Sequence, residues 1–162
     1  MILDKLWGGL KRIANGDYVL EGDLVCDENL EIRLDDRLVV TGKIEVKKSI
    51  EAGGDIKAGE GIKAGGDIKA GGGIEAGGGI KAGCGIKAGC GIKASCGIEA
   101  GCGINADWGI KAKTFIHAEK RIFAGISVYH NATNCDKTIR CAELRKGDIV
   151  HGELIITAEQ EG

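Results

Sequence analysis

A hydrophobic residue recurs at every sixth position over much of this chain. From Ile44 to Ile122 each sixth residue is isoleucine, and the residue two positions further on, from Ala52 to Ala124, is alanine. A lysine or glutamate separates the two in most repeats, and glycine fills most of the three positions that follow. The stretch 53–112 therefore reads as copies of one unit, Gly-x-Gly-Ile-Lys-Ala. Self-similarity at a fixed period is the signature of a repeat architecture.

The alternation within each repeat predicts a short strand followed by a bend. We number the isoleucine as position one, so that alanine is position three and the glycines fill positions four to six. A helix is disfavoured because each glycine costs roughly 1 kcal/mol relative to alanine. Glycine clusters instead mark bends, where the backbone turns or approaches a neighbour closely. Positions one, three and five share parity, so all three are predicted to face inward.

Short strands joined by bends predict a chain that coils, with each coil hydrogen-bonded to the next about 4.8 Å away. Three six-residue sides give an 18-residue coil, and two sides give a 12-residue coil. A three-sided coil stacks Lys57, Glu75, Lys93 and Lys111 in one column. The charges do not decide between the two, because each stack has favourable and unfavourable neighbours. We favour three sides, since three isoleucines then meet at the axis. The predicted fold class is all-β, a single-stranded parallel β-helix (β-solenoid).

The repeat extends outward in degraded form, which divides the chain into three parts. Upstream, Ile32 and Leu38 continue the isoleucine position, and Leu34 and Val40 the alanine position. The larger inward residues there predict wider first coils. The solenoid is therefore expected to span residues 18–128, between end segments 1–17 and 129–162.

The first segment, 1–17, carries apolar residues at spacings of three and four, which predicts an amphipathic helix that ends at Asn15 and Gly16. Such a helix would either cap the solenoid or dock on a membrane surface or a partner. The apolar stripe comprises Ile2, Leu3, Leu6, Trp7, Leu10 and Ile13.

The last segment, 129–162, predicts strands at 138–144 and 148–157 around a turn at 145–148. It is expected to be either a carboxy-terminal β cap or a dimerisation element.

Composition narrows the class of protein. The chain has 29 glycines and no proline without a strict triplet, which excludes collagen. A formal charge of −2 gives no long-range attraction to nucleic acid or anionic lipid. The charged start and the lack of a long apolar run predict no signal peptide and no membrane span. Seven cysteines, an odd number, fit reduced thiols in a cytoplasmic protein.

The Gly-x-Ile-Lys-Ala rhythm between residues 20 and 128 resembles hexapeptide-repeat β-solenoids and is similar to the bactofilin polymer-forming domain. It also resembles short, uncharacterised repeat proteins of bacteria and their phages. The bactofilin resemblance implies a scaffold that self-assembles. The hexapeptide acyltransferases share a solenoid, but they need a catalytic histidine and a loop that interrupts the coils. No such insertion exists between Ile44 and Ile122.

Four cysteines at position five of successive repeats allow two interpretations. They could form a metal or thiol ladder, or they could fill the core as small apolar side chains. Their spacing fits no usual metal site, so core filling is favoured, and no metal or cofactor is predicted. The four are Cys84, Cys90, Cys96 and Cys102.

Three histidines, His117, His130 and His151, show no nucleophile–base pattern. No catalytic residue is predicted, and we expect the protein not to be an enzyme.

Trp108 occupies position five, where it is too large for a core sized for cysteine, so it is expected at an opened corner. That corner is either a local packing adjustment or a binding site. The candidate interaction residues lie where the repeat degrades and in the end segments: Trp7, Trp108, Lys113, His117, Phe123 and Tyr129.

Two functions fit these features. The first is a protein-interaction module in the cytoplasm of a bacterium or an infected host cell. A phage-encoded accessory protein, or an inhibitor of a defence system such as CRISPR, is an example. The second is a self-assembling structural scaffold. The expected partner is another protein or a second copy, with a homodimer favoured. Nucleic acid is less favoured, because Glu75 and Glu99 interrupt the lysines.

Overall fold

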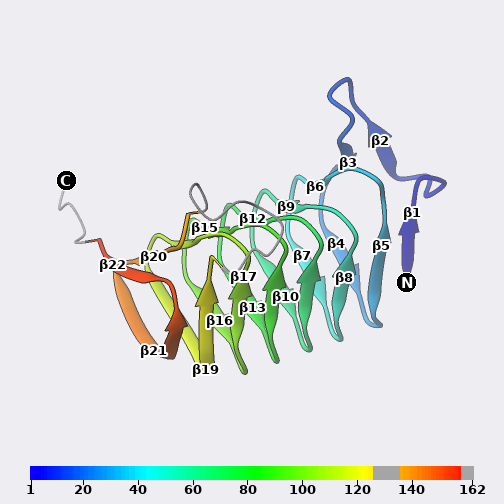
Figure 1. Cartoon of the computed structure of the whole chain (residues 1–162). Helices are drawn as coiled ribbons and strands as arrows, with labels where there is room; N and C mark the ends of the chain where they lie inside the picture. The colour runs from blue at the N-terminus through cyan, green and yellow to red at the C-terminus, as the bar shows by residue number, and fades with distance from the viewer. Residues whose placement is uncertain (126–135, 158–162) are drawn as a thin grey trace.

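The chain forms a β-solenoid, seen in a computed structural model that describes residues 1–125 and 136–157 (Figure 1). It has about seven coils of about 18 residues each, and no helix among the described residues. The predicted all-β parallel solenoid is confirmed.

Each hexad from Ile44 to Ala112 contributes one strand of three residues, from position one to position three. The strand ends after the alanine because the glycines that follow bend the chain. The strands of the solenoid body are β3 (Tyr18–Leu20), β4 (Leu24–Cys26), β5 (Leu30–Arg33), β6 (Leu38–Val40), β7 (Ile44–Val46), β8 (Ile50–Ala52), β9 (Ile56–Ala58), β10 (Ile62–Ala64), β11 (Ile68–Ala70), β12 (Ile74–Ala76), β13 (Ile80–Ala82), β14 (Ile86–Ala88), β15 (Ile92–Ala94), β16 (Ile98–Ala100), β17 (Ile104–Ala106), β18 (Ile110–Ala112) and β19 (Phe115–Ala124).

The strands stack in parallel on three faces. Face one holds β5, β8, β11, β14, β17 and the second half of β19. Face two holds β4, β7, β10, β13, β16 and the first half of β19. Face three holds β3, β6, β9, β12, β15 and β18. Ile62 pairs with Ile44 on one side and Ile80 on the other, so successive coils lie 18 residues apart. The three-sided coil is confirmed.

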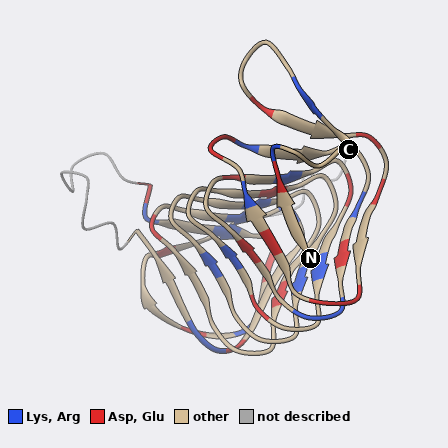
Figure 2. Ribbon diagram, turned by 90° about the vertical axis from the view of Figure 1, so that its right-hand side faces the viewer, with Lys and Arg blue, Asp and Glu red and all other residues tan. Residues whose placement is uncertain are grey.

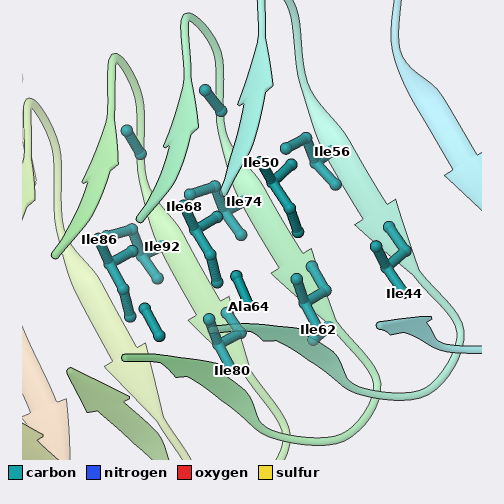
Figure 3. Close-up of a cluster of buried hydrophobic side chains, with 14 of the residues drawn as sticks. Ile44, Ile50, Ile56, Ile62, Ala64, Ile68, Ile74, Ile80, Ile86 and Ile92 are labelled. Atoms are coloured by element: carbon teal, nitrogen blue, oxygen red, sulfur yellow. The ribbon is translucent and has the colours of Figure 1, made fainter. Parts of the chain in front are cut away.

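Isoleucine fills the axis of the rod (Figure 3). Ile44, Ile62 and Ile80 form one column, and the isoleucines of the other two faces point toward it. Every position-one isoleucine from Ile44 to Ile122 is 1% exposed or less. No coil can bury these side chains alone, so stability comes from stacking.

Position four brings successive backbones into close approach. A Cβ on Gly71 would overlap the carbonyl oxygen of Gly53, one coil earlier, and Gly77 stands in the same relation to Gly59. Gly53 itself has only the Leu34 oxygen nearby, 3.9 Å from such a Cβ. Glycine at position four therefore allows the closest stacking. Ser95 and Asp107 also occupy position four, and each donates its N–H to the earlier coil at 3.1 Å, compared with 2.9 Å for Gly71.

Position six clamps the early coils together through polar side chains. Asp55 Oδ1 accepts a hydrogen bond from the Gly73 N–H, and Asp67 Oδ1 accepts one from the Gly85 N–H, at 2.5 and 2.8 Å. Each bond joins one corner to the coil above it. This explains the recurrence of aspartate among the glycines of the earlier repeats.

Position five does not face the core, so the core-filling interpretation of the four cysteines was wrong. Cys84 and Cys96 are exposed, and Cys90 and Cys102 are half-buried. The strand ends at position three, and the bend at position four redirects the chain. The alternation of an extended strand therefore does not reach position five.

The first coil is wider than the others, as predicted. Leu24 pairs with Ile44 whereas Ile44 pairs with Ile62, so the first coil is two residues longer. The predicted phase was wrong upstream, because Leu30, and not Ile32, pairs with the isoleucine Ile50. The two extra residues lie between β5 and β6, where Leu34 is buried and fills the corner.

The predicted amino-terminal helix at 1–17 was wrong. Residues Ile2–Asp4 form β1, which pairs in parallel with β5, and Leu10–Arg12 form β2, which pairs antiparallel with β3 (Figure 1). Leu3 is fully buried against the first coil, but Leu6 is 92% exposed, so the stripe is not one buried face. Gly8 and Gly9 also disfavour a helix. The β2–β3 hairpin ends face three with an antiparallel strand.

Asp35 ties the first residues to the first coil. Its carboxylate accepts hydrogen bonds from the Lys5 ammonium at 2.7 Å and the Tyr18 hydroxyl at 2.9 Å. These two bonds, that of Lys5 first, lower the pKa of Asp35 to about 2. A carboxylate with a lowered pKa stabilises the fold above its ordinary pKa, and the effect is lost as pH falls through the folded value.

Replacing Asp35 by asparagine is therefore expected to lower the midpoint of thermal unfolding at pH 7. The difference from the unmodified chain should shrink as pH falls from about 4 to about 2, because the Asp35 carboxylate takes up a proton over this range. Thermal unfolding between pH 2 and pH 7 measures it. Asp27→Asn, at an exposed corner beside Lys47, is the control. A difference that stays the same at pH 2 and pH 7 would contradict this role for Asp35.

The carboxy-terminal strands continue the stack. They are β20 (Thr138–Cys141), β21 (Glu143–His151) and β22 (Glu153–Ile156). β20 pairs in parallel with β18, β22 with β20, and β21 with β19. The predicted turn at 145–148 was wrong, because these residues lie inside β21. Gly147, with φ of +133°, passes over Ile122 where the register shifts. The expected boundary at 128/129 lies outside the described residues.

Candidate functional site

Each face of the rod carries a shallow groove along its position-six glycines. The glycines at position six have no side chain, whereas the neighbouring residues at position two have long ones. This difference in height leaves a channel parallel to the rod axis. On face three the groove encloses about 450 Å³. Its floor and walls come from Gly73, Gly91, Gly109, Lys57, Glu75, Lys93, Lys111, Cys90, Trp108 and Asp136.

Trp108 stands at the corner where face one turns into face three, as the sequence predicts. The residues one, two and three coils earlier in this corner column are Cys90, Gly72 and Gly54. The Trp108 N–H donates to the Cys90 carbonyl oxygen at 3.3 Å, and its own carbonyl accepts from the Gly125 N–H at 3.1 Å. These two hydrogen bonds fix the backbone of Trp108 at the corner, while the residue is 41% exposed beside the groove.

Toward its carboxy-terminal end the groove on face three has the cations Lys93 and Lys111 and one acid, Asp136, whose carboxylate lies over Gly109. Glu75 lies between Lys57 and Lys93, with Nζ–O distances of 3.6 and 3.5 Å. Lys111 and Arg140 follow in the same column. Glu75 is shared by two lysines, so positive charge remains over β15, β18 and β20. Over the rod as a whole the two signs of charge are interleaved (Figure 2).

A second groove, of about 650 Å³, runs along face one. At its carboxy-terminal end Phe123 lies directly over Asn105. The Asn105 side-chain oxygen is buried and accepts no hydrogen bond from the described residues. Lys69 and Lys87 precede Asn105 in this column.

The groove on face two, of about 420 Å³, ends at Phe115, and a cluster of paired charges lies at this end of the face. His117 Nε2 lies 2.8 Å from Glu119 Oε1, and Lys146 donates to the other oxygen of the same carboxylate. These bonds, that of Lys146 first, lower the pKa of Glu119 below its ordinary value. The Arg145 guanidinium stacks on the Phe115 ring, with Cζ 3.7 Å from the ring centroid. The charged groups here satisfy one another.

Phe115 and Asn105 were missed by the sequence reasoning. Phe115 stands at position six, and its ring covers Gly97, where a Cβ would come within 2.5 Å. Asn105 is the one asparagine at position two between β8 and β18. Each differs from the residues that usually occupy its position, glycine at position six and lysine or glutamate at position two. This departure from the repeat is the signal that could have identified them.

The predicted interaction residues are distributed rather than gathered. Trp108 belongs to the groove on face three, Phe123 to that on face one and His117 to the cluster on face two. Lys113 is exposed at the corner between faces three and two. Trp7 is half-buried at the other end of the rod. Tyr129 lies outside the described residues.

The described residues contain no group of three or more histidine, cysteine, aspartate and glutamate side chains that could hold a metal ion. Burial raises the pKa of the Cys90 thiol, with Asp55 and Asp107 adding to the effect. In residues 1–125 and 136–157 the structure contains no helix long and apolar enough to cross a membrane.

Comparison with protein-family models, with curated proteins and with solved structures finds no match to the chain.

Proposed function

We propose that the chain is a non-enzymatic binding rod and that the groove on face three takes a segment of a partner protein. The observation that carries this is Trp108, a large aromatic side chain 41% exposed at a corner whose earlier coils carry only glycine and cysteine. Exposed tryptophan beside a preformed groove is typical of the residues that contribute most to protein–protein affinity.

The charges of the groove favour a protein partner over a nucleic acid. Its lining includes the acids Asp55, Glu75 and Asp136 among its cations. A surface that follows a phosphate backbone needs uninterrupted positive charge, because each phosphate contact is an ionic one. Acids at intervals would repel such a backbone but leave room for a protein surface of mixed charge.

The partner segment is expected to combine an apolar side chain with carboxylates. The apolar side chain would pack on the indole of Trp108, and a carboxylate would meet Lys111 or Arg140, which follow Lys93 in the column. These cations lie at the coil spacing, about 4.8 Å apart along the rod. Such contacts would fix the register of the partner along the groove.

Truncation of Trp108 tests the proposal. Trp108→Ala is expected to weaken binding of the full chain to its purified partner roughly 30-fold, which corresponds to about 2 kcal/mol. Trp7→Ala, at the opposite end of the rod, is the matched control and should leave the affinity unchanged. Titration calorimetry gives both dissociation constants. Equal losses for the two variants, or no loss for Trp108→Ala, would reject the groove as the binding surface.

End-to-end pairing of two copies is a second candidate, favoured by the carboxy-terminal end of the rod. Val150, Leu154 and Ile156 there are 54%, 38% and 53% exposed. The described residues provide no strand beyond β21 or β22. Two such ends related by a two-fold axis would bury these side chains and pair the edges. The antiparallel β2 at the other end opposes head-to-tail growth. Light scattering during size exclusion distinguishes a dimer from a single chain and from a bactofilin-like polymer.

A more specific proposal concerns the identity of the partner. A phage accessory protein, or an inhibitor that occupies a component of a bacterial defence complex such as CRISPR, would need a rigid surface without catalytic groups. The uniform coils support that reading, because they hold the grooves in fixed positions. Binding assays with purified defence complexes, with Trp108→Ala as the negative control, test it directly.

A further inference from the structure

Two of the corner cysteines are stacked directly on each other. The corner between faces two and one forms a column of Gly66, Cys84, Cys102 and Lys120. The N–H of each residue donates to the carbonyl oxygen of the residue one coil earlier, at 3.1, 3.0 and 3.0 Å. The two thiols therefore belong to adjacent coils in matched register.

The other two repeat cysteines have no such neighbour. In its corner column Cys90 lies between Gly72 and Trp108, and Cys96 lies between Gly78 and Thr114. The burial that raises the pKa of the Cys90 thiol also makes it a poorer nucleophile. Within the described residues, Cys84 and Cys102 are thus the one pair of corner cysteines in adjacent coils.

The corner satisfies what a disulfide requires. Adjacent coils lie about 4.8 Å apart, and bridged cysteines have Cα atoms about 4.4–6.8 Å apart. The Cβ atoms must approach each other slightly more than parallel stacking allows. Glycine on both sides of each cysteine (Gly83 and Gly85, Gly101 and Gly103) gives the corner freedom to adjust. Cys84 is exposed and Cys102 half-buried, so an oxidant reaches the pair.

We propose that Cys84 and Cys102 form a reversible disulfide that staples two consecutive coils when the protein meets a hydroperoxide. The thiolate of the exposed Cys84 attacks one oxygen of hydrogen peroxide, and the O–O bond breaks to give a sulfenic acid and hydroxide. The Cys102 thiolate then attacks that sulfur, and the S–O bond breaks with loss of a second hydroxide. The protons that the two thiols released convert both hydroxides to water. Two thiols lose two electrons in total, and the peroxide gains them. A dithiol reductant reverses the step by exchange.

The staple would restrain the carboxy-terminal half of the rod. Cys84 follows β13 and Cys102 follows β16, so the bond joins two coils that are otherwise held by hydrogen bonds and stacking alone. A repeat protein frays coil by coil, and a covalent link between neighbours opposes that separation. The grooves that contain Gly85, Gly103 and Lys120 on face one would be held at a fixed width.

Peptide mapping of the oxidised full chain tests the inference. The Cys90→Ser, Cys96→Ser double variant is treated with hydrogen peroxide, digested with trypsin without reduction and analysed by mass spectrometry. The expected product links the peptide 82–87 to the peptide 94–111 with loss of two hydrogens. Thermal unfolding should shift upward by about 5 °C and return on reduction.

The Cys84→Ser and Cys102→Ser variants are the matched controls and should show neither the link nor the shift. A link only between different copies of the chain, or no link between Cys84 and Cys102 within one chain, would overturn the inference.

Discussion

Replacing Gly71 by alanine is expected to destabilise the rod by about 3 kcal/mol. The added methyl would overlap the carbonyl oxygen of Gly53, which is backbone and has no rotamer to change. The Gly71 N–H donates to the Ala52 carbonyl oxygen at 2.9 Å, so moving the corner away would stretch this bond. The coils must therefore separate locally, as they do at Asp107 in the same corner column, whose N–H lies 3.1 Å from the Ala88 oxygen.

Gly53→Ala is the matched control, because Gly53 occupies the same corner column one coil earlier. A methyl there meets only the Leu34 oxygen, at an ordinary 3.9 Å, and the Gly53 N–H bond to Ile32 is already long at 3.3 Å. Its effect is expected to stay within about 0.5 kcal/mol. Urea unfolding followed by circular dichroism gives both values. Equal destabilisation by the two variants would show that glycine is needed there for its flexibility and not for close approach.

Ile74→Ala is expected to cost about 3 kcal/mol. Ile74 is 1% exposed and pairs with Ile56 and Ile92 in the middle of the rod. Truncation leaves a cavity at the axis that neighbouring isoleucines, held in register by the ladder, fill only in part. Ile74→Val removes one methyl group and should cost about 1 kcal/mol.

A central cavity should also weaken the coupling between the two halves of the rod, because coils contact only their neighbours. Urea unfolding of Ile74→Ala should therefore broaden relative to Ile74→Val. Hydrogen exchange should increase most in β9, β12 and β15. A cost of Ile74→Ala no larger than that of Ile74→Val would mean that the axis is loosely packed, contrary to the complete burial of its isoleucines.

The sequence predicted the architecture because one physical rule repeats without interruption. Each isoleucine must find the axis, and the six-residue period leaves few ways to close a coil. The same rule failed where the strand ends. Parity placed Cys84 and Cys96 inside, but the bend at position four cancels the alternation. At the amino terminus a helical spacing of apolar residues coincided with strands, because Leu3 alone of that stripe is fully buried.

The candidate site was predicted in part. Trp108 was identified because a tryptophan does not fit among glycines and cysteines, and steric argument alone places it at a corner. The distribution of Phe123 and His117 over different faces follows from coil geometry that sequence spacing does not give. Asn105 and Phe115 also needed coordinates, since their roles depend on residues 18 positions away.

Site-specific photocrosslinking tests most directly the claim that the groove on face three binds a partner protein. A photoreactive amino acid replaces Lys111 on face three in one chain and Lys63 on face two in another, and each is irradiated in a lysate of the source cells. Both residues are exposed, and each is the position-two residue of its strand, Lys63 in β10 and Lys111 in β18. We predict one dominant protein adduct from position 111, absent from position 63 and abolished by Trp108→Ala. The same adducts from both positions, or an adduct at 111 that survives Trp108→Ala, would contradict the claim.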